Sequence, residues 1–109
     1  MRLQFCLPLL VAAALLSRPV YADAPATLTI KNHKFFPDHL VVPAGAKFKI
    51  LVVNADATPE EFESSDLDRE KLVTAGSSIT VFLGPLDPGT YHFFGDFHQD
   101  TAQGVLVAK

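Results

Sequence analysis

The C-terminal stretch YHFFGDFHQDTAQGVLVAK, residues 91–109, decides the fold. Successive side chains of a strand point to opposite faces, so Tyr91, Phe93 and Gly95 would share one face. Polar loop residues follow, and the stretch ends on the alternating apolar run GVLVAK, residues 104–109. It therefore predicts a strand, a polar loop and a closing strand.

Four more short runs with strand character lie upstream, each bounded by turn residues. They read ATLTIKN, HLVVPAG, KFKILVVN and SSITVFLGPL, and LDPGTYHFF places a Pro-Gly turn directly before the strand of Tyr91. Leu28 and Ile30 in the first run alternate with polar neighbours, as in a half-buried strand. Six or seven strands with regular turn signals predict an antiparallel sandwich or barrel with very little helix.

The segment from Asp56 to Gly76 does not show this pattern of short apolar runs separated by turns, because it contains seven acidic residues. Its part SSDLDREKLV is compatible with one helical turn capped by Ser65 or Asp66. We interpret the segment as an excursion between strands.

Residues 1–24 have the pattern of a secretory signal peptide. Arg2 precedes the apolar stretch FCLPLLVAAALL, and SRPVYADA offers small residues for cleavage after Ala22 or Ala24. The alternative, an N-terminal membrane anchor, is disfavoured because a span needs about 20 apolar residues. We expect residues 25–109 to form one exported, periplasmic domain that does not span the membrane after cleavage.

The exported domain would contain no thiol, because the single cysteine, Cys6, lies in the leader. A disulfide, a thiolate metal site and a cysteine nucleophile are then excluded. Seven basic and twelve acidic side chains follow Ala22, a net charge of −5 with histidine neutral. That charge argues against nucleic acid and anionic membranes as partners, and is compatible with cations or with simple solubility.

Two segments offer metal ligands. The loop GDFHQDTAQG places Asp96, His98 and Asp100 within five residues, and such a mixed nitrogen and oxygen set fits Cu(II) or iron better than Cu(I). An exposed polar turn with a surface histidine explains the loop equally well. In the second segment, Glu61 and Glu63 would share one strand face, which indicates either a cation or a solvent-exposed face.

In that second segment Glu60 would lie on the opposite face, with Phe62. His33, at the end of the first strand, is a marginal further ligand. The chain has neither a phosphate-binding glycine loop nor a plausible nucleophile with its base, so any catalysis would have to come from a metal.

Three segments carry a family resemblance: KFFPDHLVVPAGAKFKILVVNAD, GPLDPGTYHFF and FHQDTAQGVLVAK. Over essentially its full mature length the chain resembles the cupredoxins, which implies an all-β, Greek-key β-sandwich of about seven strands with a metal at one end. The segment EEFESSDLDREKLVTAG is similar to periplasmic cupredoxin-like proteins associated with bacterial high-affinity iron uptake.

The resemblance carries over unevenly to the blue-copper ligands. A glutamate of TPEEFES stands where the first histidine would be, and the cysteine would fall near Phe94 or Gly95. His98 matches the second histidine, and no methionine stands near Thr101 or Ala102. The resemblance implies no thiolate blue-copper centre. In the iron-uptake subgroup the EFE carboxylates, here Glu61 and Glu63, are thought to replace those ligands.

These observations give a leading hypothesis of an exported protein that binds copper or iron through oxygen and nitrogen ligands. The expected ligands are His98 and Glu61, assisted by Asp96 and Glu63, with His33 marginal. Its partner would be an iron permease or another periplasmic iron-uptake component, and its activity would be ion handling or assisted ferrous oxidation. The alternatives are a metal-free adaptor of a transport complex and a periplasmic copper buffer.

Overall fold

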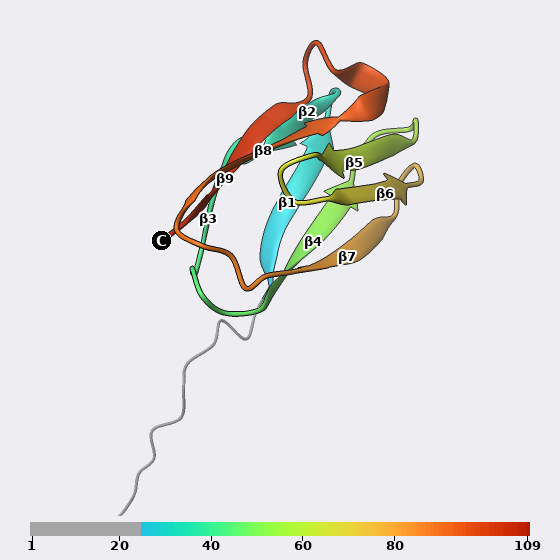
Figure 1. Ribbon diagram of the computed structural model, residues 1–109. Coiled ribbons are helices and arrows are strands. Elements are labelled where there is room, and N and C mark those ends of the chain that lie inside the picture. The colour runs from blue at the N-terminus through green and yellow to red at the C-terminus, as the bar shows by residue number, and fades with distance from the viewer. Residues whose placement is uncertain (1–24) are drawn as a thin grey trace, which may run out of the picture.

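The computed structural model describes residues 25–109, so the expected signal peptide, residues 1–24, lies outside the described part. Two sheets pack face to face as a β-sandwich, in the strand orders β2-β1-β4-β7 and β3-β9-β8-β5-β6 (Figure 1). The elements are β1 (Ala26–Lys31), β2 (Lys34–Phe36), β3 (His39–Val42), β4 (Phe48–Asn54), β5 (Glu60–Ser64), β6 (Arg69–Val73), β7 (Ser78–Leu83), β8 (Gly89–Gly95), the 3-10 helix η2 (Asp96–His98) and β9 (Gln103–Ala108).

The predicted all-β sandwich is confirmed, with nine strands in the described residues instead of about seven. The expectation of purely antiparallel pairing was wrong. β1 pairs with β4 in parallel, and β3 pairs with β9 in parallel. The reason is the short link between β2 and β3, which carries the chain from one sheet to the other, so that strands close in sequence lie in different layers.

The interpretation of residues 56–76 as an excursion was also wrong, because β5 and β6 form a hairpin at the edge of the five-stranded sheet. The two strands are joined by a single hydrogen-bonded turn and not by a helix, with the N–H of Asp68 donating to the carbonyl of Ser65 at 3.2 Å. The Ser64 hydroxyl accepts the backbone N–H of Leu67 at 3.0 Å, and Asp68 takes a left-handed φ of 56°. The guanidinium of Arg69 donates to the carbonyl of Phe82 and so connects this edge to β7 of the other sheet.

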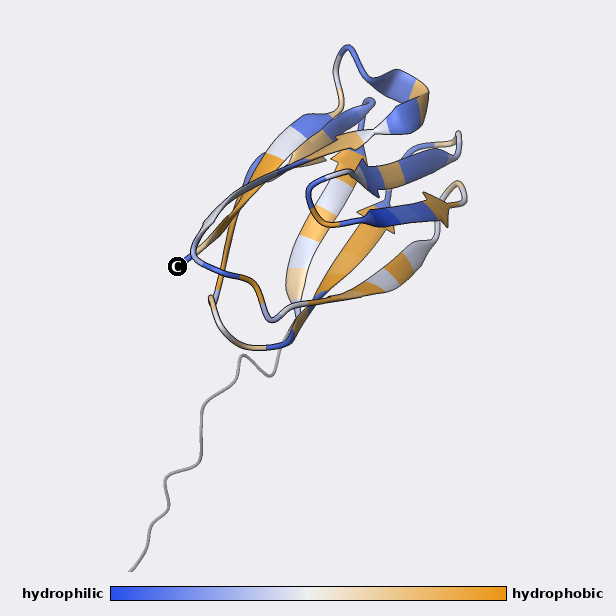
Figure 2. Cartoon of the chain, viewed as in Figure 1, coloured by the Kyte–Doolittle hydropathy of each residue, from blue (hydrophilic) through white to orange (hydrophobic). Residues whose placement is uncertain are grey.

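The core lies between the sheets, as the alternation predicts. Leu28, Ile30 and Phe93 are fully buried. Phe93 contacts Phe35 edge-on, with ring centroids 5.1 Å apart, and Phe62 at 5.4 Å. These three rings join β2 of one sheet to β5 and β8 of the other. In Figure 2, β6 and the loop beyond η2 are mainly hydrophilic, whereas β4 is mainly hydrophobic.

Among residues 25–109 the structure contains no helix long or apolar enough to span a membrane.

Candidate functional site

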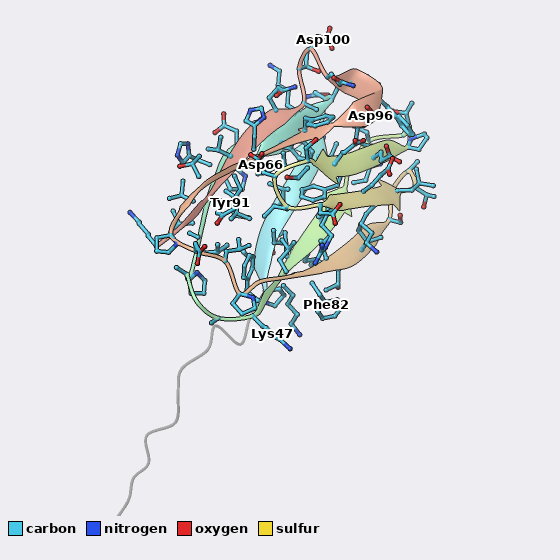
Figure 3. The ribbon with its side chains drawn as sticks, in the orientation of Figure 1. Lys47, Asp66, Phe82, Tyr91, Asp96 and Asp100 are labelled. Carbon is cyan, nitrogen blue, oxygen red and sulfur yellow. The ribbon has the colours of Figure 1, made fainter. Side chains whose placement is uncertain are left out.

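The candidate site lies at the end of the sandwich where β8 runs into η2. Figure 3 labels Asp96 and Asp100 on this loop, whereas Lys47 and Phe82 lie at the opposite end of the sandwich. The loop meets the start of β5 and the turn between β1 and β2, so three chain segments distant in sequence converge there.

Glu60 is the central side chain of this end, and only 1% of its surface is exposed. Its Oε1 accepts the backbone N–H groups of Glu61 and Phe97, both at 2.9 Å. Its Oε2 lies 2.6 Å from Nδ1 of His98. Because a carboxylate can only accept, the ring carries its hydrogen on Nδ1 in this contact. All three hydrogen bonds are made to one buried carboxylate, which compensates its loss of water.

The structure therefore brings His98 to Glu60 and does not bring it to Glu61, which was the expected partner. The reason is the strand period of β5. Phe62 and Ser64 are buried in the sandwich, so Glu60 points inward with them. Glu61 and Glu63 leave from the other, partly exposed face. The sequence already placed Glu60 on the face of Phe62, and that was the signal for this residue.

Gly95 explains why the Glu60 carboxylate fits here. A Cβ added at Gly95 would lie 2.7 Å from Cδ of Glu60 and 2.8 Å from Cβ of Ala102, closer than real side chains approach. The carboxylate therefore occupies the space into which a side chain at position 95 would extend. No thiolate or other ligand is present at this position.

His33 reaches the site from a left-handed turn. Asn32 and His33 have φ values of 53° and 60°, and their backbone N–H groups donate to the two carboxylate oxygens of Asp56 at 2.7 and 2.9 Å. Partial burial alone would raise the pKa of Asp56, but these two donors and the nearby charges outweigh it and lower the pKa. One carboxylate thus holds a backbone conformation that non-glycine residues rarely adopt.

The ring of His33 stacks on the ring of His98, with centroids 3.5 Å apart and planes at 11°. The Thr101 hydroxyl donates to the carbonyl of His33 at 2.6 Å, and the Thr58 hydroxyl lies 3.5 Å from Nε2 of His33. The β1–β2 turn and the loop after η2 are therefore joined by a ring stack and a hydrogen bond.

A second group of acidic side chains covers the outer face of β5 and β6. One carboxylate oxygen from each of Glu61, Glu63 and Glu70 lies within 4.8 Å of the others. Partial desolvation, then the charge of Glu70, the hydrogen bond and charge of Glu63, and the charge of Asp96 raise the pKa of Glu61 to about 7. This cluster can hold a cation through oxygen alone, but exposed carboxylates also gather without one.

The five expected ligands are thus divided between two places. His98 and His33 lie together at the end of the sandwich, while Glu61 and Glu63 lie in the outer cluster. Asp96 lies near Glu61 and accepts a hydrogen bond from the Gln99 amide at 2.7 Å. Whether any of them ligates a metal stays a prediction.

The donor atoms of His98 and Glu60, which we call the inner pair, decide which ion would fit. Nδ1 of His98 and Oε2 of Glu60 face each other, which gives one borderline nitrogen and one hard oxygen donor. These donor types suit Cu(II) or iron, and they do not suit a centre that depends on a thiolate. At 2.6 Å the two atoms are hydrogen-bonded to each other, so they would have to separate before an ion about 2.0 Å from each could bind. His33 and His98 cannot bind one ion in the stacked arrangement, because each ring nitrogen directs its lone pair within its own ring plane.

Comparison with known proteins supports the fold independently. The amicyanin of Paracoccus versutus superposes with a TM-score of 0.63 at 18% identity, covering 83% of this chain and 85% of amicyanin. A purple cupredoxin from Nitrosopumilus maritimus gives a TM-score of 0.62 at 18% identity, covering 77% of this chain and 99% of that protein. At such identities the likeness concerns the fold alone.

Sequence comparison finds a nearer relative. The uncharacterized protein RP394 of Rickettsia prowazekii (strain Madrid E) is 55% identical over 82 residues, which cover 75% of this chain. The match spans 66% of that protein, slightly less than two thirds of its length. The family model of the cupredoxin-like domain matches residues 5–108, almost the whole sequence. On that match, the chain belongs to the cupredoxin-like domain family.

Proposed function

We propose that this protein binds Cu(II) or iron at the end of the sandwich through His98 and Glu60, without a thiolate. The observation that carries the proposal is the buried Glu60 carboxylate, which faces the one histidine that keeps a cupredoxin ligand type in the expected loop. The family resemblance, which implies a metal at one end of the sandwich, supports the proposal. In this proposal Glu60, and not Glu61, is the carboxylate ligand that pairs with His98.

The protein's own groups would orient the ligands. The backbone N–H groups of Glu61 and Phe97 hold Oε1 of Glu60 and leave Oε2 directed at His98. A bound copper or iron ion would supply a one-electron redox couple, which is the chemistry that assisted ferrous oxidation requires. Metal binding would displace the hydrogen from Nδ1 of His98, so binding should weaken as the pH falls.

Calorimetric titration of residues 25–109 with Cu(II), Fe(II) and Fe(III) tests the proposal. The variants Glu60→Gln and His98→Ala should each lose well over tenfold in affinity, because each removes a proposed ligand. The matched variants Glu61→Gln and Glu63→Gln should bind like the parent. If these outer variants lose affinity and the inner ones do not, the outer carboxylate cluster is the site.

A second candidate function, a metal-free adaptor of a transport complex, has its own supporting observation. The Glu60 carboxylate already accepts three N–H donors, so the Glu60–His98 contact can act as a purely structural link. This function would be favoured if none of the three ions binds. Binding of copper with no measurable affinity for iron would favour the third alternative, a copper buffer.

We further propose that the protein works outside the cytoplasm beside an iron permease. The proposal rests on the export pattern of residues 1–24, on the EEFESSDLDREKLVTAG resemblance and on the net charge of −5, which suits a protein that handles cations. Deleting the gene should reduce iron accumulation at low iron supply, and restoring the parent gene should reverse the loss. Unchanged iron uptake would contradict this role.

The absence of a thiolate predicts the colour of the copper-loaded protein. Cu(II) bound to residues 25–109 should show no intense charge-transfer band near about 600 nm, because that band needs a copper–thiolate bond. The protein exported from the full sequence should give the same spectrum, and an intense band in that sample would show that Cys6 is retained and ligates the ion.

A further inference from the structure

Three features of the described residues are not used by the proposed function. They are the exposed carboxylate cluster, the apolar side chains on the outer sheet faces, and the stack of His33 on His98. Only the stack comes with several independent contacts that fix one side chain against another. Of these three features, the stack alone contacts a proposed ligand, the ring of His98.

The backbone of His33 is held from two sides. Asp56 fixes the backbone of Asn32 and His33 on one side, and the Thr101 hydroxyl fixes the carbonyl of His33 on the other. Because φ of His33 is 60°, its side chain leaves the turn in a direction that an ordinary strand residue cannot reach. That direction places the ring face to face with His98.

The stacked geometry gives His33 a role other than that of a ligand. A metal bound to an imidazole lies in the ring plane, about 2.0 Å from the nitrogen. The two rings are nearly parallel with centroids 3.5 Å apart, so an ion in the plane of His98 lies out of the plane of His33 and beyond its lone pairs. His33 instead covers one face of the His98 ring.

We infer that His33 is a positioning residue, which fixes the ring plane of His98 so that Nδ1 stays directed at Glu60. The His98 ring is held at Nδ1 by Glu60 and on its face by His33, and these two contacts together restrict rotation about both side-chain bonds. Asp56 acts through His33, because it holds the turn that aims the ring. The effect of His33 on metal affinity rests on the proposed function, because it requires a metal bound to His98.

Two substitutions separate positioning from ligation. His33→Phe keeps a flat ring for stacking and removes both nitrogens, whereas His33→Gly removes the ring and tolerates the left-handed φ. We expect His33→Phe to bind metal with an affinity close to that of the parent and His33→Gly to bind about tenfold more weakly, the usual loss when a supporting contact is removed. His39→Ala, which removes an exposed histidine on β3, is the matched control and should leave the affinity unchanged.

A second readout uses the metal-free protein and is therefore independent of metal binding. In the NMR spectrum the His98 ring protons should be shifted upfield by the facing ring in the parent and in His33→Phe, and not in His33→Gly. The Nδ1 hydrogen of His98 should exchange with water faster in His33→Gly, because the ring is free to turn away from Glu60.

The outcomes are distinct. Equal loss of affinity in His33→Phe and His33→Gly would show that His33 is a ligand and would overturn the inference. Unchanged ring shifts and exchange in metal-free His33→Gly would also overturn it, whether or not metal binds. A parent that binds no metal but shows the predicted shifts and exchange would contradict the proposed function and support the positioning role. Thermal melts establish that both variants are folded.

Discussion

Asp56 shows how much of this site depends on a single side chain away from the proposed ligands. Its two oxygens hold the N–H groups of Asn32 and His33, residues that lie more than 20 positions earlier in the chain. Its own N–H donates to the buried Asn54 side chain, so the carboxylate is itself fixed in place. The left-handed turn, and with it the His33 ring, depends on this residue.

The substitution Asp56→Ala should lower the free energy of unfolding by about 2 kcal/mol, because two N–H groups lose a charged acceptor. Replacing the exposed Asp100 by Ala should change it by less than about 0.5 kcal/mol. The measurement is urea denaturation of both variants beside the parent. Equal small losses would mean that solvent can replace the Asp56 contacts.

The pH dependence at Asp56 follows from its lowered pKa. Since the unfolded chain takes up a proton at Asp56 at a higher pH than the folded protein does, the contribution of Asp56 is complete above the unfolded pKa and is lost as the pH falls through the folded pKa. The stability difference between the parent and Asp56→Asn should therefore shrink below about pH 4. Thermal melts of the two proteins from pH 7 down to pH 3 measure it, and a constant difference would contradict the assignment.

Glu61 should show the opposite dependence, because its folded pKa is raised to about 7 from 4.5. The folded protein then holds a proton that the unfolded chain has lost, so the stability of the parent falls as the pH rises from about 4.5 to about 7. Relative to Glu61→Gln, the parent should lose stability over that window and stay constant above it. NMR titration of the Glu61 carboxyl carbon gives the pKa directly, and a midpoint near 4.5 would contradict the prediction.

The strands show which parts of the structure could be predicted from the sequence. The inward face of β1 could be predicted, because Leu28 and Ile30 alternate with threonine and lysine. In β8 the strand period alone places Phe93 on the face of Tyr91 and Gly95, since its neighbour Phe94 is also apolar. In β5 the sequence EEFES places glutamates on both faces, so alternation alone does not say which one reaches His98. The choice follows from burial of Phe62, which also brings Glu60 into the core.

Other parts of the site depend on contacts that no local pattern contains. The stack of His33 on His98 joins segments 65 residues apart and requires the left-handed turn at Asn32. The β5–β6 hairpin was missed because its many charged residues favour solvent, whereas at the edge of a sheet one face of each strand remains available to water.

Close packing between β8 and β5 makes a prediction about Gly95. The substitution Gly95→Ala should destabilise the protein by about 1–3 kcal/mol, because the new methyl group meets the Glu60 carboxylate and Ala102. Gly89→Ala is the matched control on the same strand, since its added Cβ would make only ordinary contacts at 3.8 Å or more.

A double variant tests the cause of that destabilisation. If Glu60 is responsible, Gly95→Ala should cost less in a Glu60→Ala background than in the parent, as measured by a double-mutant cycle of denaturation free energies. Strictly additive losses would assign the clash to Ala102 alone.

At the scale of the whole molecule, charge is divided between the two sheets. Lysines lie on β1, β2 and β4, and no strand of this four-stranded sheet has an acidic residue. All acidic residues in the described strands lie on β5 and β6 of the five-stranded sheet, where they outnumber the basic Arg69 and Lys71. Negative potential therefore concentrates near the candidate site, where it would attract cations in preference to anions. Salt should weaken this attraction because the carboxylates of the outer cluster are partly exposed.

The proposed export makes a prediction about the N-terminus of the mature protein. The protein recovered from the periplasm should begin at Asp23 or at Pro25, according to whether cleavage follows Ala22 or Ala24. Intact mass spectrometry of the periplasmic fraction measures this directly. A mass that includes Met1 or Cys6 would contradict cleavage, and it would restore a thiol to the functional protein.

The shared space of Glu60 and Gly95 also limits how this site could change by mutation. A chain that gained cysteine at position 95 would first suffer the clash with the carboxylate, and a chain that first lost Glu60 would leave the Phe97 and His98 donors unpaired. Either order passes through a less stable intermediate, so the two positions are epistatic. Single substitutions are therefore poor routes from this arrangement to a thiolate centre, and a stepwise path would need compensating stability gained elsewhere in the fold.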